Sequence, residues 1–478
     1  MQFVKNGQNN VSYWLVFLFF LVPVGLLLLF KAKVLIFVLF VLFFLWILSY
    51  HLNLGLYVLA FLAPMMHWTF YLNNFRFLFE DYPQLLGFFA PVVDVWAVVL
   101  LLAFVLYAIR QLVQGKDVNL RLPGINFYGL FLLSAVFSLT NVLPGELWSS
   151  VKYIIRFPLF VYLGYVVLGT SIIHSKQIWE NTLKSFLMST TLGAFMGFAS
   201  ILLGVWGLAG FRRAVPFAIG GWMPFGDQHI FLAEILVVAI PIALYFWNKN
   251  KQEKNKNLQW ISLIVFLIFI CLATLSRAGW LTLFVELTLF VYLFRTKIDI
   301  KKIYKKILLA IILLSPFLLY MAIFLTTKVV TLSNAARFAL TEISWYLFEL
   351  KFILGQGVGT FIARVSEINY FVYEFGIPID AHSVVSKIMS EQGLVGLITF
   401  GLFVFWIIKN LYKNFNPKNL NGDSLSAALG ILMVVGILFF QLFSTQYYSA
   451  KMWVPIMLAI SSFLVCEHCN HLDKKYEK

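Results

Sequence analysis

The chain has 478 residues, of which 61% are hydrophobic and only 12% are charged. This apolar fraction exceeds that of a soluble domain, and the apolar residues occur in runs of about 17 to 22, the length that a helix needs to cross a bilayer. The composition therefore indicates an integral membrane protein. The net charge of +15 does not indicate nucleic-acid binding, because the basic residues lie in short loops where positive charge sets membrane orientation.

Apolar runs of membrane-spanning length follow one another along the chain. The first run, at 11–30, lacks a small-residue cleavage signal, so we expect an uncleaved span rather than a signal peptide. Because runs of this kind leave no alternating pattern for barrel strands, the sequence predicts an all-α fold, a polytopic bundle of about 12–14 transmembrane helices. Short paired runs near Lys31 and Leu52 are candidates for re-entrant or fused helices. The expected spans are 11–30, 34–50, 52–69, 92–110, 125–140, 153–173, 184–205, 229–247, 260–276, 279–295, 307–326, 393–411, 425–443 and 450–466.

Lysine and arginine residues cluster in alternate loops between these runs. The positive-inside rule places those loops in the cytoplasm, so both termini are expected there, and the long polar segment 327–392 is expected on the outer face. Lys31 and Lys33 depart from the rule and affect the first hairpin only. The clusters that carry the assignment are Arg110, Lys116 and Arg121; Lys176 and Lys184; Lys249, Lys251, Lys254 and Lys256; Arg295 to Lys306; Lys409, Lys413 and Lys418; and the tail.

The outer segment 327–392 is too polar and too interrupted to cross a bilayer, and it predicts short helices at the membrane surface. Ser333 or Asn334 is a suitable N-cap for a helix from Ala335 to Leu354 that ends at Gly355 and lies along the interface. The following GQGVGTF does not fit a dinucleotide-binding loop, because no strand precedes it and the glycine spacing differs. We interpret it as a helix stop and turn.

His382 lies in the second predicted helix of this segment, which begins near Asp380 or Ala381 and ends at Gly393. In the first helical turn the helix dipole disfavours the imidazolium form, so a neutral ring is available as a general base. The alternative is that His382 only forms hydrogen bonds within the loop or at the interface. The residues themselves leave both interpretations open.

Several arginines fall on the predicted outer face, although membrane orientation selects against them there. The planar guanidinium binds phosphate or carboxylate with two hydrogen bonds, which makes these residues candidate anion ligands. For each one, the alternative is that it reaches to lipid headgroups. Arg277 is the most informative, because the turn TLSRAGWLTL has almost no loop and keeps its guanidinium at the membrane boundary. The arginines in this set are Arg76, Arg156, Arg212, Arg213, Arg277, Arg337 and Arg364.

Four motifs in order resemble the O-antigen ligase/polymerase family of bacterial membrane glycosyltransferases. They are SRAGWL at 276–281, Arg337, the LGQGVGTF turn and AHSVVSKIMSEQGLVGL at 381–397. Ser383 stands where that family has an Asn after the His, whereas the Glu-x-Gly-Leu-x-Gly pattern is present as Glu391, Gly393, Leu394 and Gly396. The resemblance covers about residues 220–410, so we expect this core, with its outer loop 327–392, between transmembrane helices at 1–219 and at 411–478 with the tail.

The resemblance implies an inverting, metal-independent glycan transfer at the outer, periplasmic face of the bacterial inner membrane. The implied donor is an undecaprenyl-diphosphate-linked oligosaccharide, and the acceptor is a sugar hydroxyl of a glycan or of a lipid-linked chain. His382 would take the proton from that hydroxyl, and Arg277 and Arg337 would hold the diphosphate. Membrane lipids are further expected partners and a chain-length regulator is a candidate one; no cofactor, metal or nucleic acid is expected. Arg212, Arg213 or Arg156 is the expected third diphosphate ligand, and Ser276, Glu391 and Asp380 are expected to support the site.

Within the family, the sequence slightly favours a repeat-unit polymerase, because the outer loop includes no extra domain to recognise a protein acceptor. A ligase that transfers the finished chain onto a lipid A core is the next alternative, followed by a protein oligosaccharyltransferase. A flippase or other transporter stays open because Glu234 and Glu286 lie in apolar runs, where we expect them to face the bundle interior. Against a transporter, no internal repeat is seen. A purely structural assembly role would not require Arg277, Arg337 and His382 together.

The tail contains a second candidate pattern, CEHCNH, in which Cys466, His468, Cys469 and His471 are spaced like metal ligands. The spacing is too compressed for a tetrahedral zinc site, and two of the residues lie near the end of a span, so a metal site is not expected. Together with Cys271 the chain has three cysteines, too few and too scattered to form a disulfide framework.

Overall fold

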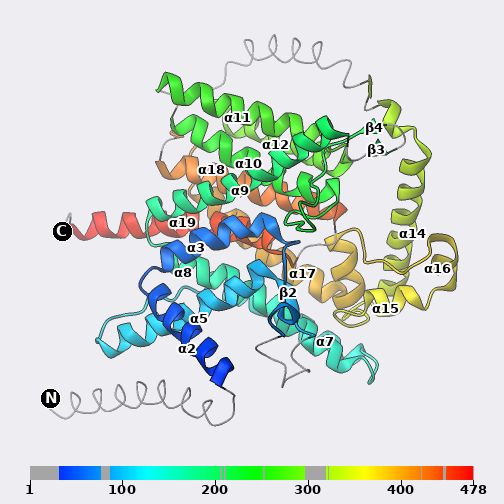
Figure 1. Cartoon of the computed structure of the whole chain (residues 1–478), viewed down its shortest axis with the longest axis horizontal. Coiled ribbons are helices and arrows are strands. Elements are labelled where there is room, and N and C mark those ends of the chain that lie inside the picture. Colours follow the sequence, from blue (N-terminus) through cyan, green and yellow to red (C-terminus); the bar gives the residue numbers. More distant parts are fainter. Residues whose placement is uncertain are drawn as a thin grey trace.

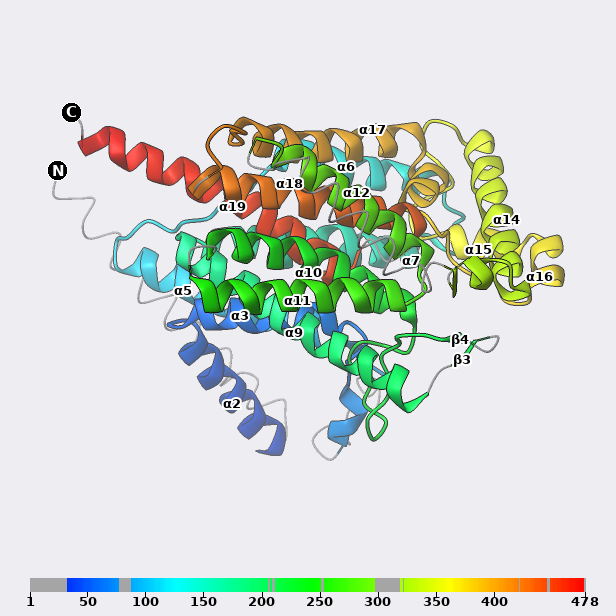
Figure 2. The ribbon, with the colours of Figure 1, turned by 90° about the horizontal axis from the view of Figure 1, so that it is seen from above.

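The computed structural model describes residues 32–76, 87–204, 207–208, 211–250, 253–296, 319–320, 322–420, 422–444 and 448–476. These residues form a bundle of long helices with three further helices across one end (Figures 1 and 2). The strands in this part of the chain form two small antiparallel ribbons, β1 (Thr69–Tyr71) with β2 (Phe89–Pro91) and β3 (Gly207–Leu208) with β4 (Phe211–Arg212). The predicted all-α, polytopic fold class is therefore confirmed.

Seven helices in the described residues are long and apolar enough to cross a membrane. The predicted runs at 34–50 and 52–69 form α2 (Ala32–Leu48) and α3 (Leu52–Leu62), which are bent by 105° and together give an eighth candidate span. The predicted span 11–30 and most of 307–326 lie outside the described residues. The seven are α5 (Val92–Val113), the segment Leu147–Ile172, α9 (Lys176–Leu203), α10 (His229–Lys249), α11 (Lys254–Ala273), α17 (Val384–Lys413) and α18 (Gly422–Phe440).

Three further apolar runs also form helices, but shorter or less apolar ones. They are α6 (Ile125–Ser138), α12 (Arg277–Leu293) and α19 (Ala450–Tyr476). The segment Leu147–Ile172 is not one regular helix, because Pro158 has no backbone N–H to donate and the chain widens into π turns there. It consists of α7 (Leu147–Ile154), η5 (Ile155–Leu159), η6 (Tyr162–Val167) and α8 (Leu168–Ile172). Short 3-10 turns occur elsewhere in the described chain, as η1 (Ala63–Met65), η2 (Leu72–Phe75), η4 (Leu139–Asn141) and η7 (Gln441–Phe443).

The core of the bundle lies around α10, α18 and α19. Glu234 of α10 is 1% exposed and pairs with Lys451 of α19 at 2.9 Å, while Gln441 donates a hydrogen bond to it at 2.7 Å. Glu286 of α12 is also buried, and it has no hydrogen-bond partner within the described residues. Both acidic side chains thus face the bundle interior, as predicted. For Glu234, the ion pair with Lys451 satisfies the buried charge, which fits a structural role for this residue.

The outer segment lies at the end of the bundle opposite the carboxyl end of α19 (Figure 1). It forms α14 (Lys328–Leu350), α15 (Phe361–Ser366) and α16 (Asn369–Phe375), so short helices are present as expected. The predicted cap was wrong: α14 begins after Thr327, and Ser333 and Asn334 lie inside it. The helix also ends at Leu350 rather than Leu354. A small core of its own joins the three helices, made of Ala339, Leu340, Ile343, Leu347, Phe361, Val365, Phe371 and Ala381.

The predicted helix ending at Gly393 and the predicted span from 393 are one element, α17, which is broken at Gly393 (φ 63°). The turn after α14 fills the break. Gln356 and Gly357 donate their N–H groups to the carbonyls of Ser390 and Glu391 at 2.8 and 2.9 Å, and Leu394 donates to Phe352 at 2.9 Å. A Cβ on Gly355 would lie 2.3 Å from the Glu391 backbone carbon. The glycines thus allow the turn to replace the missing helical hydrogen bonds.

Candidate functional site

A cavity of about 330 Å³ lies at the end of the bundle that the outer segment covers. Arg213 follows β4, Arg277 begins α12, Arg337 lies in α14, and His382 precedes α17. The predicted residues Arg213, Ser276, Arg277, Arg337 and His382 are thereby brought into one site. The other lining residues are Gln228, His229, Ile230, Leu275, Ala278, Phe324, Val330 and Ser333.

Arg277 is positioned by the tight turn between α11 and α12. Leu275 has φ 54°, a left-handed conformation that is rare for a residue with a side chain, and it turns the chain within two residues. Ser276 then caps α12, because its hydroxyl accepts a hydrogen bond from the Gly279 N–H at 3.3 Å. The Arg277 guanidinium donates to the side-chain oxygen of Asn334 in α14. Asn334, predicted as a cap, instead links Arg277 to the helix that holds Arg337.

Arg213 reaches the same cavity through a backbone contact. The neighbouring Ala214 donates its N–H to the carbonyl of Ala273 at the end of α11, at 2.8 Å. Burial lowers the pKa of Arg213 from its ordinary value, and burial together with Arg277 lowers that of Arg337. In the described part of the chain, none of these three arginines forms an ion pair. Three converging cations without a carboxylate make a site suited to a polyanion.

His382 is half-buried, and the side chain of the preceding Ala381 is fully buried in the small core of the outer segment. Burial lowers the pKa of His382 from its ordinary value of 6.5, and Arg337 lowers it further, whereas Asp380 acts in the opposite direction. The predicted place in the first helical turn was wrong, because α17 begins at Val384 with Ser383 as its N-cap. The neutral imidazole therefore results mainly from burial and the arginine rather than from a helix dipole.

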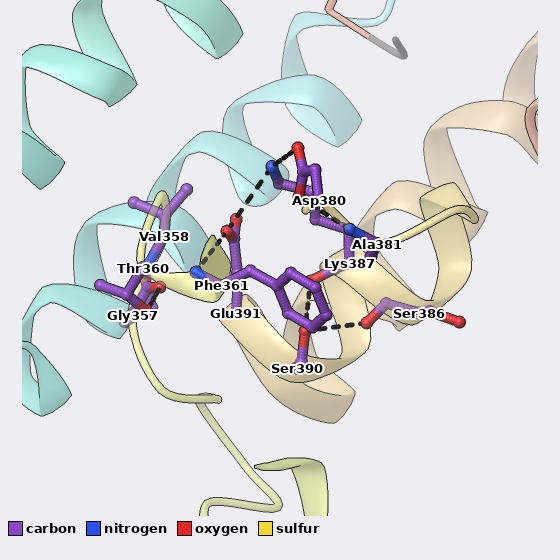
Figure 3. A network of polar contacts seen from close by, with 11 residues as sticks. Gly357, Val358, Thr360, Phe361, Asp380, Ala381, Ser386, Lys387, Ser390 and Glu391 are labelled. Carbon is purple, nitrogen blue, oxygen red and sulfur yellow. Dashed lines mark hydrogen bonds and ion pairs between the residues drawn. The ribbon is translucent and has the colours of Figure 1, made fainter. Parts of the chain in front are cut away.

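Asp380 and Glu391, the predicted supporting residues, lie in one polar network around Lys387 (Figure 3). Lys387 is 4% exposed and pairs with Asp380 at 2.5 Å and with Glu391 at 3.8 Å. Asp380 also accepts the Ala381 N–H at 2.9 Å, and Glu391 accepts the Phe361 N–H at 3.2 Å. The network ties the segment before His382 to α15 and α17. Neither carboxylate lines the cavity, so both act at a distance from it.

Sequence reasoning did not assign a role to Lys387, His229 or Gln228. The i, i+4 spacing of Lys387 and Glu391 was a visible signal for a helical ion pair. His229 is the first residue of α10 and lines the same cavity as the three arginines. Its position at the start of an apolar run on the predicted outer face was the available signal.

Three other predicted arginines lie outside this cavity. Arg212 is exposed and donates to the Ile201 carbonyl at 3.4 Å, at the end of α9. Arg156 lines a separate, mainly apolar groove of about 440 Å³ together with Asp94 and Phe88. Arg364 is held by ion pairs with Glu146 at 2.9 Å and Glu367 at 2.8 Å, which join α15 to the loop before α7. Of the candidate third ligands, the structure brings Arg213 alone to Arg277 and Arg337.

Comparison with known families matches residues 262–401 to the O-antigen ligase family. The matched stretch runs from α11 into α17 and contains Arg277, Arg337 and His382. No curated protein matches the chain. The predicted resemblance is confirmed over the region that forms most of the cavity. The chain is thus a multi-pass membrane protein with long apolar helices, and its residues 262–401 are similar to the O-antigen ligase family.

Proposed function

We propose that the protein is a repeat-unit polymerase of bacterial surface polysaccharide. It transfers glycan from an undecaprenyl-diphosphate-linked donor to a sugar hydroxyl of a second lipid-linked chain, at the outer face of the inner membrane. The observation that carries the proposal is that Arg213, Arg277, Arg337 and His382 line one cavity of about 330 Å³. A diphosphate needs cationic ligands, and a hydroxyl nucleophile needs a base beside them.

In the proposed reaction, His382 accepts the proton of the acceptor hydroxyl while the hydroxyl oxygen attacks the anomeric carbon of the donor. The bond from that carbon to the diphosphate oxygen breaks, and the lipid diphosphate leaves with the electron pair. The three guanidinium groups stabilise the negative charge that develops on it. Because attack and departure occur on opposite faces of the sugar, the configuration inverts. His382 then releases its proton to solvent, and the base is restored.

Fixed positive charge is the usual contribution of a metal to the departure of a diphosphate. Here arginines supply such charge from three separate elements, which supports a reaction that needs no metal. The pKa of His382 is lowered by burial and by Arg337, so its neutral form predominates at pH 7. This supports its role as the base, since a useful base must be unprotonated at the working pH.

The size of the outer segment supports the polymerase over the transfer to a protein. In the described residues, this segment comprises α14, α15 and α16 with their connecting loops, and it has only one small core. A lipid-linked acceptor needs no additional recognition domain, because the membrane already holds both substrates at the same depth.

The test is an assay of the purified full-length protein with a lipid-diphosphate-linked oligosaccharide, with and without a chelator. We expect a ladder of longer lipid-linked products that the chelator does not change. His382→Ala and Arg337→Ala should lose the ladder, and Arg212→Ala, outside the cavity, should keep it. Products that form only when a lipid A core is added would make the enzyme a ligase. Lipid movement across proteoliposomes without any product would overturn the enzymatic proposal.

A further inference from the structure

A second charged cavity, of about 420 Å³, lies between α9, α10 and α11. The helix α10 connects the two cavities: it begins at His229 in the candidate site and ends at Lys249 in this one. Its 21 residues separate them by roughly 30 Å, about the thickness of the hydrocarbon layer. The proposed reaction makes no use of this second cavity, which therefore needs its own explanation.

The lining is cationic. It contains Lys184, Lys249 and Lys256 and one carboxylate, Glu180. That carboxylate is already engaged, because it accepts hydrogen bonds from Lys249 at 2.5 and 2.6 Å and from the Tyr245 hydroxyl at 2.9 Å. Glu253, which pairs with Lys256 from outside the lining, is a second nearby carboxylate. Three ammonium groups against two carboxylates still leave the cavity with positive charge for an incoming anion.

Two of the lysines are available to that anion. Lys184 has no ion pair in the described part of the chain, and its ammonium lies 5.6 Å from the centre of the Phe246 ring. Lys256 pairs with Glu253 at 2.7 Å, but both side chains are more than half exposed, so this pair is weak and easily exchanged. Asn250 and Gln259 add neutral hydrogen-bond donors to the same wall.

The aromatic part of the lining indicates the depth of the cavity in the membrane. Phe246 and Trp260 stack with their ring centres 5.2 Å apart, and Leu263 continues the apolar wall one turn further along α11. Trp residues favour the boundary between the hydrocarbon and the headgroups, and basic pockets between helices at that boundary suit anionic lipid headgroups. The polar rim suits the headgroup of a phospholipid, and the apolar wall suits its acyl chains.

We propose that this cavity binds the phosphate headgroup of an anionic phospholipid, with its acyl chains along Trp260 and Leu263. Lysine is a suitable phosphate ligand, as a compact point charge that does not require planar geometry. The proposal goes beyond the glycan transfer and does not depend on it, because the two cavities share α10 but no residue.

The test compares the lipids retained by the full-length protein in nanodiscs of phosphatidylglycerol and phosphatidylcholine, using native mass spectrometry. The variant is Lys184→Ala/Lys256→Ala. The matched control is Lys409→Ala/Lys413→Ala, which removes two exposed lysines at the end of α17 remote from His382. We expect wild type to retain phosphatidylglycerol preferentially and the cavity variant to lose at least about tenfold in affinity for it, while the control is unchanged.

Inorganic phosphate is added in a separate arm to distinguish the lipid from a free anion. We expect millimolar phosphate not to displace the lipid, because it lacks the acyl chains that contact the apolar wall. Equal retention of the two lipids would overturn the proposal, as would equal losses in the variant and the control. Displacement by inorganic phosphate would also overturn it, in favour of a soluble anion. The thermal unfolding of both variants is measured to verify that each is folded.

Discussion

The two ends of α10 hold two cationic cavities that are built in different ways. At the His229 end, three arginines without ion pairs in the described residues converge from separate elements beside the neutral His382. At the Lys249 end, the lysines come from three consecutive helices, and one of them is neutralised by Glu180. Planar guanidinium groups on separate segments suit a diphosphate that must be held in a fixed orientation, as the proposed reaction requires. Flexible ammonium groups suit a lipid headgroup that is only bound.

The largest expected effect is on the rate of glycan transfer, and it distinguishes the cavity at the His229 end of α10 (the reactive end) from the cavity at the Lys249 end (the binding end). His382→Ala should lower the rate of glycan transfer by about 10² to 10⁴, because it removes the proposed base. Lys184→Ala/Lys256→Ala should leave this rate within about twofold in the same detergent. Single-turnover assays with lipid-linked oligosaccharide measure both. Comparable losses from the two variants would mean that the two ends are not functionally distinct.

A second comparison tests how the reactive end is held together. Gly355→Ala should destabilise the protein by about 2–4 kcal/mol, because its Cβ would lie 2.3 Å from the Glu391 backbone and its φ is +68°. Gly376→Ala has a φ of +88° but nothing within 4 Å, so it should lose only about 1 kcal/mol from strain. Denaturant unfolding in detergent measures both. Equal losses would mean that the turn does not clamp the break in α17.

A matched pair of neighbouring arginines tests the geometry of the cavity. Arg213→Ala should lower the rate about tenfold or more, since it removes one of the three positive charges proposed to stabilise the leaving diphosphate. Arg212→Ala should change it by less than about twofold, because this side chain is exposed and points to the end of α9. Both rates are measured in the same assay. A larger loss in Arg212→Ala than in Arg213→Ala would show that Arg212, not Arg213, is the substrate ligand.

The smallest expected effect concerns pH. In the proposed reaction the neutral His382 is the active form. Its pKa is lowered from the ordinary value of 6.5, so the rate should be level near pH 7 and fall only at acid pH. In Lys387→Ala, Asp380 loses the ion pair that neutralises it and acts more strongly on His382, which raises the pKa of the imidazole. The acid limb of the pH–rate profile should then move to higher pH. A Lys387 with only a structural role would lower the rate without moving that limb.

Length and apolarity predicted most helices, because a run of about twenty apolar residues has few other stable forms in a membrane. The convergence of Arg277, Arg337 and His382 was predicted from the family motifs together with the outer face on which the sequence places all three residues. The adjacent residues Arg212 and Arg213 were not separable in this way. Arg212 ends the strand β4 and Arg213 follows it, and neighbouring side chains of extended backbone point in opposite directions. Which of the two arginines reaches the cavity depends on which side of this extended segment packs against the helix bundle.

Local cap signals were less reliable in the outer segment. Ser333 and Asn334 are good N-caps by residue type, but α14 extends back to Lys328, where Val330 packs with Leu275 and Phe324. Tertiary packing thus outweighed the cap preference. The same holds for His382, which lies before α17 because Ala381 is buried in the core of the outer segment. The lysines near α10 were interpreted only as a signal of membrane orientation. The composition of a loop does not reveal that three helices enclose a cavity beside it.

The most direct test of the central claim is to separate donor binding from turnover in the cavity. The measurement is the affinity of the full-length protein for the lipid-diphosphate-linked donor, for wild type, His382→Ala and Arg337→Ala. If the arginines hold the diphosphate and His382 is the base, His382→Ala binds the donor like wild type and is inactive, while Arg337→Ala binds it at least about tenfold more weakly. Wild-type donor affinity in Arg337→Ala, or loss of donor affinity in His382→Ala, would contradict this assignment of roles.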